Sequence, residues 1–119
     1  MERVRFISHR GKQILLIDCT GCKAAEMSDV LDDVENLVTS QPKNSVVTLS
    51  IWTGMEWNKQ IFDRTKLVAV MDRPHVRKAA IVGFETMPET YRNALASFSA
   101  RSFRSFNTVD EAKDWLSED

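Results

Sequence analysis

Ser45-Val46-Val47-Thr48-Leu49-Ser50-Ile51-Trp52 is the most strand-like segment of this chain and the one from which its fold is inferred. Most of its residues are β-branched or apolar, and Thr53-Gly54 follows it as a turn. A nearly continuous run of this kind is typical of a central strand covered by helices on both faces, whereas a half-exposed strand alternates apolar and polar residues. We therefore expect a buried central strand at residues 45–52.

Comparable runs lie on either side, at residues 13–18 and 78–84, and segments with helical spacing separate the three. This alternation predicts an α/β fold with a parallel sheet whose strands follow one another in sequential order. A further strand at residues 4–8 precedes a short turn containing Gly11, so it is expected to form an antiparallel hairpin with the next strand. With a polar edge strand at residues 101–106, the sheet has five strands.

About four helices are expected between and after these strands. The first spans residues 24–40, the second ends at Asp72-Arg73-Pro74-His75, the third begins near Pro88, and the fourth begins at the capping box Thr108-Val109-Asp110-Glu111. Apolar residues at helical spacing predict which side chains pack against the sheet. They are Met27, Val30, Leu31, Val34, Leu37 and Val38; Ile61, Phe62, Leu67, Val68 and Met71; Tyr91, Leu95 and Phe98; and Ala112, Trp115 and Leu116.

Length and composition narrow the classes of function. The 119 residues suit one domain, residues 1–119, and the 16 basic and 17 acidic side chains nearly cancel, which gives no reason to expect nucleic acid as a partner. The chain lacks an apolar run of about 20 residues that could cross a bilayer and has no signal-peptide pattern, so we expect a cytoplasmic location. The near-neutral charge leaves a homodimer open.

The loops that follow the parallel strands are expected to meet at one edge of the sheet, beside helix N-termini that favour anions. Trp52, Thr53, Gly54 and Trp57 all belong to the loop after the central strand. Two large rings are hard to bury in such a loop, so these four residues are the predicted site for a protein partner or a small apolar or anionic ligand.

Cys19 and Cys22 form a C-x-x-C pair between a strand and a helix, which raises the alternative of a thiol-redox protein. Asp18 precedes the pair where an aromatic residue would be expected, and its charge would raise the pKa of the neighbouring thiol. His9 and His75 stand on separate turns, so a four-ligand zinc site is not predicted.

Other catalytic patterns are missing. The sequence has no G-x-S-x-G nucleophile elbow, and its isolated glycines form no phosphate-binding loop. The carboxylates are expected at solvent-facing helix positions and not in an apolar pocket. We therefore expect a protein that is not an enzyme and needs no cofactor or metal.

The sequence resembles the STAS superfamily, and more narrowly the small bacterial SpoIIAA-like proteins, in the order of its elements and in three segments. The segments are Val46 to Gly54, the strand Lys78-Ala79-Ala80-Ile81-Val82-Gly83, and the tail Phe106-Asn107-Thr108-Val109-Asp110-Glu111-Ala112-Lys113-Asp114-Trp115-Leu116. The resemblance implies a βα superhelix related to the lipid-carrying CRAL-TRIO domains. It also implies a role like that of the anti-sigma-factor antagonists, in which a serine in the turn after the middle strand is phosphorylated by a partner kinase and controls docking.

In this chain the corresponding turn reads Ile51-Trp52-Thr53-Gly54, so Thr53 is the one hydroxyl left for phosphorylation. The combined expectation is a STAS-like interaction or regulatory module that binds at Trp52, Thr53, Gly54 and Trp57. The alternatives are a thiol-redox protein using Cys19 and Cys22, and a lipid or small-molecule carrier of the CRAL-TRIO type.

Overall fold

The structure is a computed structural model that describes residues 2–98 and 103–118, with side chains described for 2–95 and 103–118. The strands are β1 (Val4–His9), β2 (Lys12–Asp18), β3 (Val46–Ile51), β4 (Val76–Val82) and β5 (Arg104–Phe106). The helices are α1 (Ala24–Thr39), α2 (Lys59–Asp72), the 3-10 turn η1 (Phe84–Thr86), α3 (Glu89–Phe98) and α4 (Val109–Ser117).

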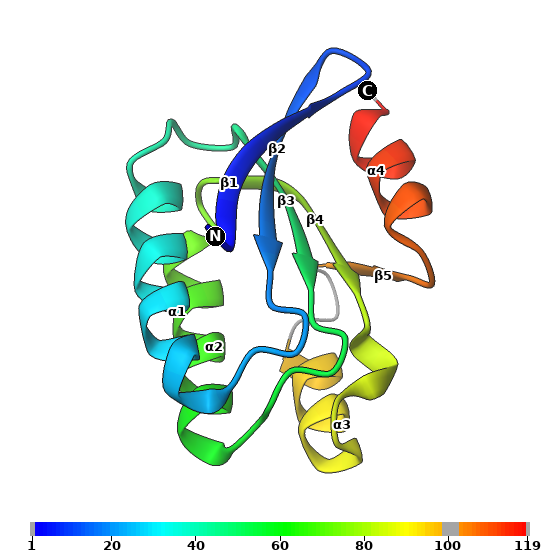
Figure 1. Ribbon diagram of the computed structural model, residues 1–119. Coiled ribbons are helices and arrows are strands. Elements are labelled where there is room, and N and C mark those ends of the chain that lie inside the picture. Colours follow the sequence, from blue (N-terminus) through cyan, green and yellow to red (C-terminus); the bar gives the residue numbers. More distant parts are fainter. Residues whose placement is uncertain (1, 99–102, 119) are drawn as a thin grey trace.

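All five strands form one sheet in the order β1-β2-β3-β4-β5. β1 and β2 pair antiparallel, and the other neighbours pair parallel (Figure 1). The α/β class and the sequential topology expected from the sequence are thus confirmed. β5 is shorter than expected within the described residues, and the predicted strand residue Arg101 lies outside them.

The helices cover both faces of this sheet: α1 and α2 lie on one face and α4 on the other (Figure 1). Successive strand residues point to opposite faces, so each central strand contributes to two cores. The core beneath α4 contains Ile14, Leu16, Val47, Leu49, Ala80, Val82, Ala112 and Leu116. The opposite core is built mainly from Leu15, Ile17, Val46, Trp52 and Ile81 of the strand segments with the apolar residues of α1, α2 and α3.

Local signals account for several helix ends. The Asn58 side chain caps α2 by accepting a hydrogen bond from the Ile61 N–H at 2.8 Å, and Thr108 caps α4 by accepting one from the Glu111 N–H at 3.2 Å. The Glu111 carboxylate in turn accepts a hydrogen bond from the Thr108 hydroxyl at 2.9 Å. The capping box expected at the start of the last helix is therefore present. Among the described helices, none has the length and apolar character that spanning a bilayer would require.

Helix α2 departs from the predicted packing. Ile61, Phe62 and Val68 are buried, but Leu67 and Met71 are about half exposed (52% and 49%). The prediction was wrong for these two residues because α2 rests on the sheet through a narrower stripe than the apolar residues of its sequence would cover. Together with Val70 they leave large apolar side chains on the outer side of the helix.

β4 ends at Val82 and not at Phe84 as expected. Gly83 adopts a left-handed conformation with φ +88°, which directs the chain out of the sheet and into η1. The sequence run 78–84 hides this break because Phe84 continues the apolar pattern beyond the glycine.

Candidate functional site

The loops after β2, β3 and β4 meet at one edge of the sheet, as the topology requires. Backbone hydrogen bonds join them: Gly21 N–H donates to Thr53 O at 3.0 Å, Trp52 N–H to Val82 O at 2.8 Å, and Glu56 N–H to Cys22 O at 2.8 Å. The Ala24 N–H at the start of α1 donates to the Glu56 carboxylate at 3.1 Å. Many of the N–H groups that could bind an anion here are therefore already bonded within the protein.

Thr53 and Gly54 are exposed at this edge, and Thr53 lies tightly against Gly83. A Cβ atom added to Gly83 would lie 2.5 Å from both the backbone nitrogen and the Oγ1 of Thr53. Cβ atoms in proteins essentially never approach other atoms so closely. Thr86 closes the same corner by donating from its hydroxyl to Gly83 O at 2.7 Å. The turn that carries Thr53 is thus held in one position by the glycine and the threonine of the next loop.

The two tryptophans of the predicted site do not form an exposed aromatic edge. Trp52 is only 8% exposed, and Trp57 is half-buried in a cluster with Phe62 and Tyr91. The Trp52 and Trp57 rings meet edge to face, with centroids 5.2 Å apart. The expectation that these rings are hard to bury was wrong for Trp52, because η1 and the residues around α3 extend the core past the end of the sheet, whereas Trp57 remains partly exposed.

Cys19 and Cys22 are both buried and present as free thiols. Burial, with a smaller effect of Cys22, raises the pKa of the Cys19 thiol to about 12, and burial also raises the pKa of Cys22. Thiol-disulfide chemistry needs a thiolate, so this environment is the reverse of that around a reactive cysteine. Within the described part of the chain, no group of three or more His, Cys, Asp or Glu side chains could hold a metal ion.

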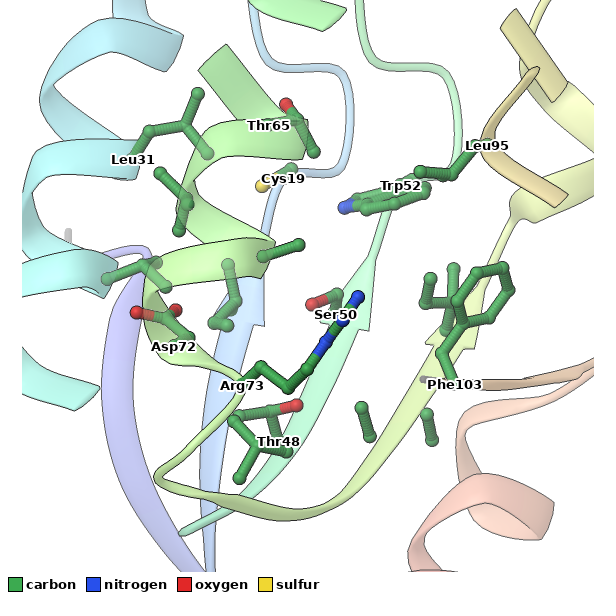
Figure 2. Close-up of a pocket in the computed structure, with 18 of the residues that line it drawn as sticks. Cys19, Leu31, Thr48, Ser50, Trp52, Thr65, Asp72, Arg73, Leu95 and Phe103 are labelled. Carbon is green, nitrogen blue, oxygen red and sulfur yellow. The ribbon is translucent and has the colours of Figure 1, made fainter. Parts of the chain in front are cut away.

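A cavity of about 580 Å³ lies between the sheet and helices α1 and α2 (Figure 2). Most of its wall is apolar, and Trp52 and Cys19 line its upper part in the view of Figure 2. The apolar wall includes Ile17, Leu31, Val34, Val68, Ile81 and Phe103.

Small side chains on the sheet leave room for this cavity. Thr48 and Ser50 of β3 and Ala79 of β4 all line it. They occupy the strand positions that face α1 and α2, whereas Val47 and Leu49 point into the core beneath α4. The central strand therefore presents small hydroxyl side chains to the cavity on one face and larger apolar side chains to the packed core on the other.

Asp72 brings a carboxyl group into the same cavity from the last turn of α2 (Figure 2). Asp72 is 6% exposed, and its Oδ1 is buried without a hydrogen-bond partner among the described residues. Burial, and secondarily the negative charge of Glu35, raises the pKa of Asp72 to about 7, although the positive charge of Arg64 acts against this. The expectation that the carboxylates avoid an apolar pocket was wrong at this residue.

The charges around Asp72 explain why the effect of burial on its pKa outweighs that of the nearby cation. Arg64 is the cation whose charge opposes the shift, and it donates to Asp32 at 2.8 Å and to Glu35 at 3.2 Å. Its charge is thus shared with two other carboxylates that join α1 to α2. Asp72 is left without a dedicated counter-charge.

Arg73 follows Asp72 and also lines the cavity, with its side chain exposed. Figure 2 shows the guanidinium group reaching across the opening toward Ser50, with Thr48 close to the same side chain in the view. An arginine together with two hydroxyls can recognise a carboxylate or phosphate group, because all three groups donate hydrogen bonds.

The structure therefore brings together some of the predicted residues and separates others. Trp52 and Cys19 line the cavity, whereas Thr53, Gly54 and Trp57 belong to the loop edge above it. The cavity residues that the sequence interpretation missed are Thr48, Ser50, Asp72 and Arg73. A signal for two of them was present, since Thr48 and Ser50 interrupt an apolar strand at alternate positions.

Comparisons with known proteins agree on the fold alone. No protein-family model matches the chain, and no curated protein matches it. Among solved structures, an uncharacterized protein of the DUF3478 family from Shewanella loihica PV-4, described as having a SpoIIAA-like fold, superimposes with a TM-score of 0.67. The two share 13% sequence identity over 95% of this chain and 91% of the other. The chain thus has the SpoIIAA-like fold that the resemblance implied.

Proposed function

We propose that this protein is a non-enzymatic binding module of SpoIIAA-like fold whose cavity between the sheet and helices α1 and α2 takes a small, mainly apolar ligand. This corresponds to the carrier alternative drawn from the sequence, with Trp52 kept as a ligand-contacting residue and the site moved from the loop edge to the cavity. Thr53, Gly54 and Trp57 then support the site from above.

The observation that carries the proposal is the cavity of about 580 Å³ with an apolar wall and a few converging polar groups. Sites for small molecules in proteins usually have volumes of about 300–1,000 Å³ and the same pattern of lining. The cavity opens to solvent beside the exposed side chain of Arg73, so a small molecule could enter it from that side.

A non-enzymatic role is supported by the side chains around the cavity. The thiol that lines it, Cys19, has a pKa of about 12 and is therefore protonated at neutral pH. Asp72 is the one buried carboxyl among the described residues, and its Oδ1 has no hydrogen-bond partner that could serve as a nucleophile. Binding without covalent chemistry is what these groups suit best.

Native mass spectrometry of the protein purified from cells, before and after denaturation, tests the proposal. We expect a bound small molecule that is lost on denaturation, and quenching or a shift of the tryptophan fluorescence, to which Trp52 contributes, when the emptied protein is titrated with apolar probes. The variant Ser50→Trp, which would fill the cavity, should abolish both signals, whereas Ser8→Trp at an exposed position of β1 should leave them intact. Purified protein that carries nothing and binds no probe would contradict the proposal.

A second candidate is a regulatory module that docks a protein partner at the loop edge. It is favoured by the exposure of Thr53 and Gly54 in the turn where the anti-sigma-factor antagonists carry their phosphorylated serine. A mass increment of one phosphoryl group at Thr53 that persists through denaturation would support this candidate, and its absence together with a bound small molecule would favour the cavity.

A further inference from the structure

The polar groups of the cavity identify the kind of ligand that it suits. Hydrogen-bond donors lie on its sheet side and at its opening, among them the hydroxyls of Thr48 and Ser50 and the guanidinium of Arg73. Thr65, Arg77 and Lys78 also belong to the lining, and most of the remaining wall is apolar. A ligand that satisfies both parts has an apolar body and an acidic head.

Asp72 is the one lining residue with an acidic side chain, and it would repel such a head if it were ionised. Its buried Oδ1 lacks a partner, and the cation that acts on it, Arg64, is already bonded to Asp32 and Glu35. The pKa of Asp72, raised to about 7 by burial and by Glu35, lets the carboxyl accept a proton near neutral pH. A protonated Asp72 has no charge to repel an acid and can donate a hydrogen bond.

We propose that the cavity binds an apolar carboxylic acid, with its carboxylate against Arg73 and the hydroxyls of Thr48 and Ser50, and that Asp72 must be protonated when the acid is bound. This inference rests on the proposed function and names the ligand class for the same cavity. Binding of the acid then takes up a proton at Asp72 and weakens as the pH rises.

Other charged groups near Asp72 do not reproduce this linkage. Arg73 and Arg77 line the cavity and carry positive charge, which favours an acidic head. Cys19 stays neutral because its pKa is about 12. His75 follows α2 closely, and its Nδ1 lies 2.8 Å from Gln41 O, so the test must separate any contribution of His75 from that of Asp72.

Three probes with the same alkyl chain distinguish the ligand classes: dodecanoic acid, dodecanol and dodecylamine. Each is titrated into the emptied protein below the aggregation limit of the probe, with tryptophan fluorescence and calorimetry as readouts. We expect the acid to bind roughly tenfold or more tightly than the alcohol, as charge-assisted hydrogen bonds to arginine would give, and the amine to bind most weakly. Equal binding of acid and alcohol would overturn the acid inference while leaving an apolar site intact.

Arg73→Gln should remove the preference for the acid over the alcohol, and Arg73→Lys should restore part of it because the charge is retained. Arg5→Gln, an exposed arginine on β1 outside the cavity, is the matched control and should bind like the unchanged protein. A preference for the acid that survives Arg73→Gln would contradict the assigned position of the head. Thermal unfolding of each variant verifies that it is folded.

The proton linkage is tested between about pH 6 and pH 8. The acid should bind up to roughly tenfold more weakly per pH unit above the pKa of Asp72, while binding of the alcohol stays nearly constant. Asp72→Asn should bind the acid without this pH dependence. If the pH dependence persists in Asp72→Asn, His75 or another group carries it and the role of Asp72 is wrong. If none of the three probes binds at any pH, the proposed function itself fails.

Discussion

On the α4 face of the sheet, β3 contributes Val47 and Leu49 to a core that Ala112 and Leu116 fill from above. On the opposite face the same strand contributes Thr48 and Ser50 to the wall of a cavity of about 580 Å³. The two sets alternate along one strand that is paired on both sides within the same sheet. The difference shows that a single strand can provide stability to one face and a binding site to the other.

The α4 face and the cavity face of the sheet should respond differently to substitution. On the face with the cavity (the hollow face), stability should tolerate changes in side-chain volume and depend on pH. On the α4 face (the filled face), stability should be sensitive to side-chain volume and independent of pH. Equal changes in the free energy of unfolding on both faces would remove the basis for assigning the cavity a function.

The largest expected effect concerns the buried carboxyl. Because the pKa of Asp72 is raised in the folded protein, the native state holds this proton more tightly than the unfolded chain, and its contribution to stability is lost as pH rises from about 4 to about 7. At about 1.4 kcal/mol per pKa unit the loss is at most about 4 kcal/mol, and solvent screening of the partly buried carboxyl reduces it. Asp72→Asn should therefore gain stability relative to the unchanged protein by up to this amount across the window, measured by urea unfolding at each pH.

Asp33→Asn, on the exposed side of α1, is the matched control for this experiment. It should change the free energy of unfolding by less than about 0.5 kcal/mol. If Asp72→Asn and Asp33→Asn show the same pH profile, the carboxyl of Asp72 is not desolvated in solution and the hollow face is wetter than the structure indicates.

Truncation should separate the two faces at adjacent residues. Leu49→Ala removes a side chain that is fully buried in the filled core and should lower the free energy of unfolding by about 3 kcal/mol. Ser50→Ala removes one hydroxyl from the cavity wall and should change it by less than about 1 kcal/mol. Denaturant unfolding of both variants measures the difference, and equal losses would mean that no cavity lies beside Ser50.

Enlargement gives the complementary test. Ala80→Val on the α4 face adds volume to a residue that is fully buried among packed neighbours and should cost about 1–3 kcal/mol. Ser50→Val adds comparable volume to the cavity and should be neutral or stabilising by up to about 1 kcal/mol, because it adds apolar contacts. A loss of stability in Ser50→Val as large as in Ala80→Val would show that the space is closed in solution.

The smallest expected effect lies on the outer side of α2. Leu67 is about half exposed, so Leu67→Gln should change stability by less than about 0.5 kcal/mol. Leu116→Gln on α4, where the side chain is buried, should cost at least about 3 kcal/mol. Light scattering of Leu67→Gln also tests the homodimer that the near-neutral charge leaves open: a shift from dimer to monomer with unchanged stability would locate a self-association surface on α2.

The sequence predicted the sheet order because long-range topology follows from few signals here: three apolar runs, helical spacing between them, and a turn at Gly11. It also located the capping box at Thr108, because that interaction is local. The packing of α2 could not be predicted in the same way. Leu67 and Met71 fit the helical stripe, and only the distance between α2 and the sheet decides that they face outward.

The site was harder to predict for a related reason. Trp52 and Trp57 are large residues in a loop, and their burial depends on Phe62 and Tyr91 from other elements. Asp72 ends a helix, a position where a carboxylate is ordinarily solvated, and only the tertiary structure places it over the sheet. The alternation of Thr48 and Ser50 within an apolar strand was the readable signal, since a strand buried equally on both faces has no need of hydroxyls at every second residue.

The loop edge above the cavity is held largely by main-chain groups, such as Gly21 N–H to Thr53 O and Trp52 N–H to Val82 O. Every residue except proline carries both of these groups, so most substitutions in the three loops leave the bonds unchanged, and Gly83 is the position that tolerates least. Over evolutionary time such an architecture constrains the path of the backbone far more than the amino-acid sequence of the loops. Lineages that inherit it can exchange nearly all side chains at this edge, and with them their partners, while the scaffold persists.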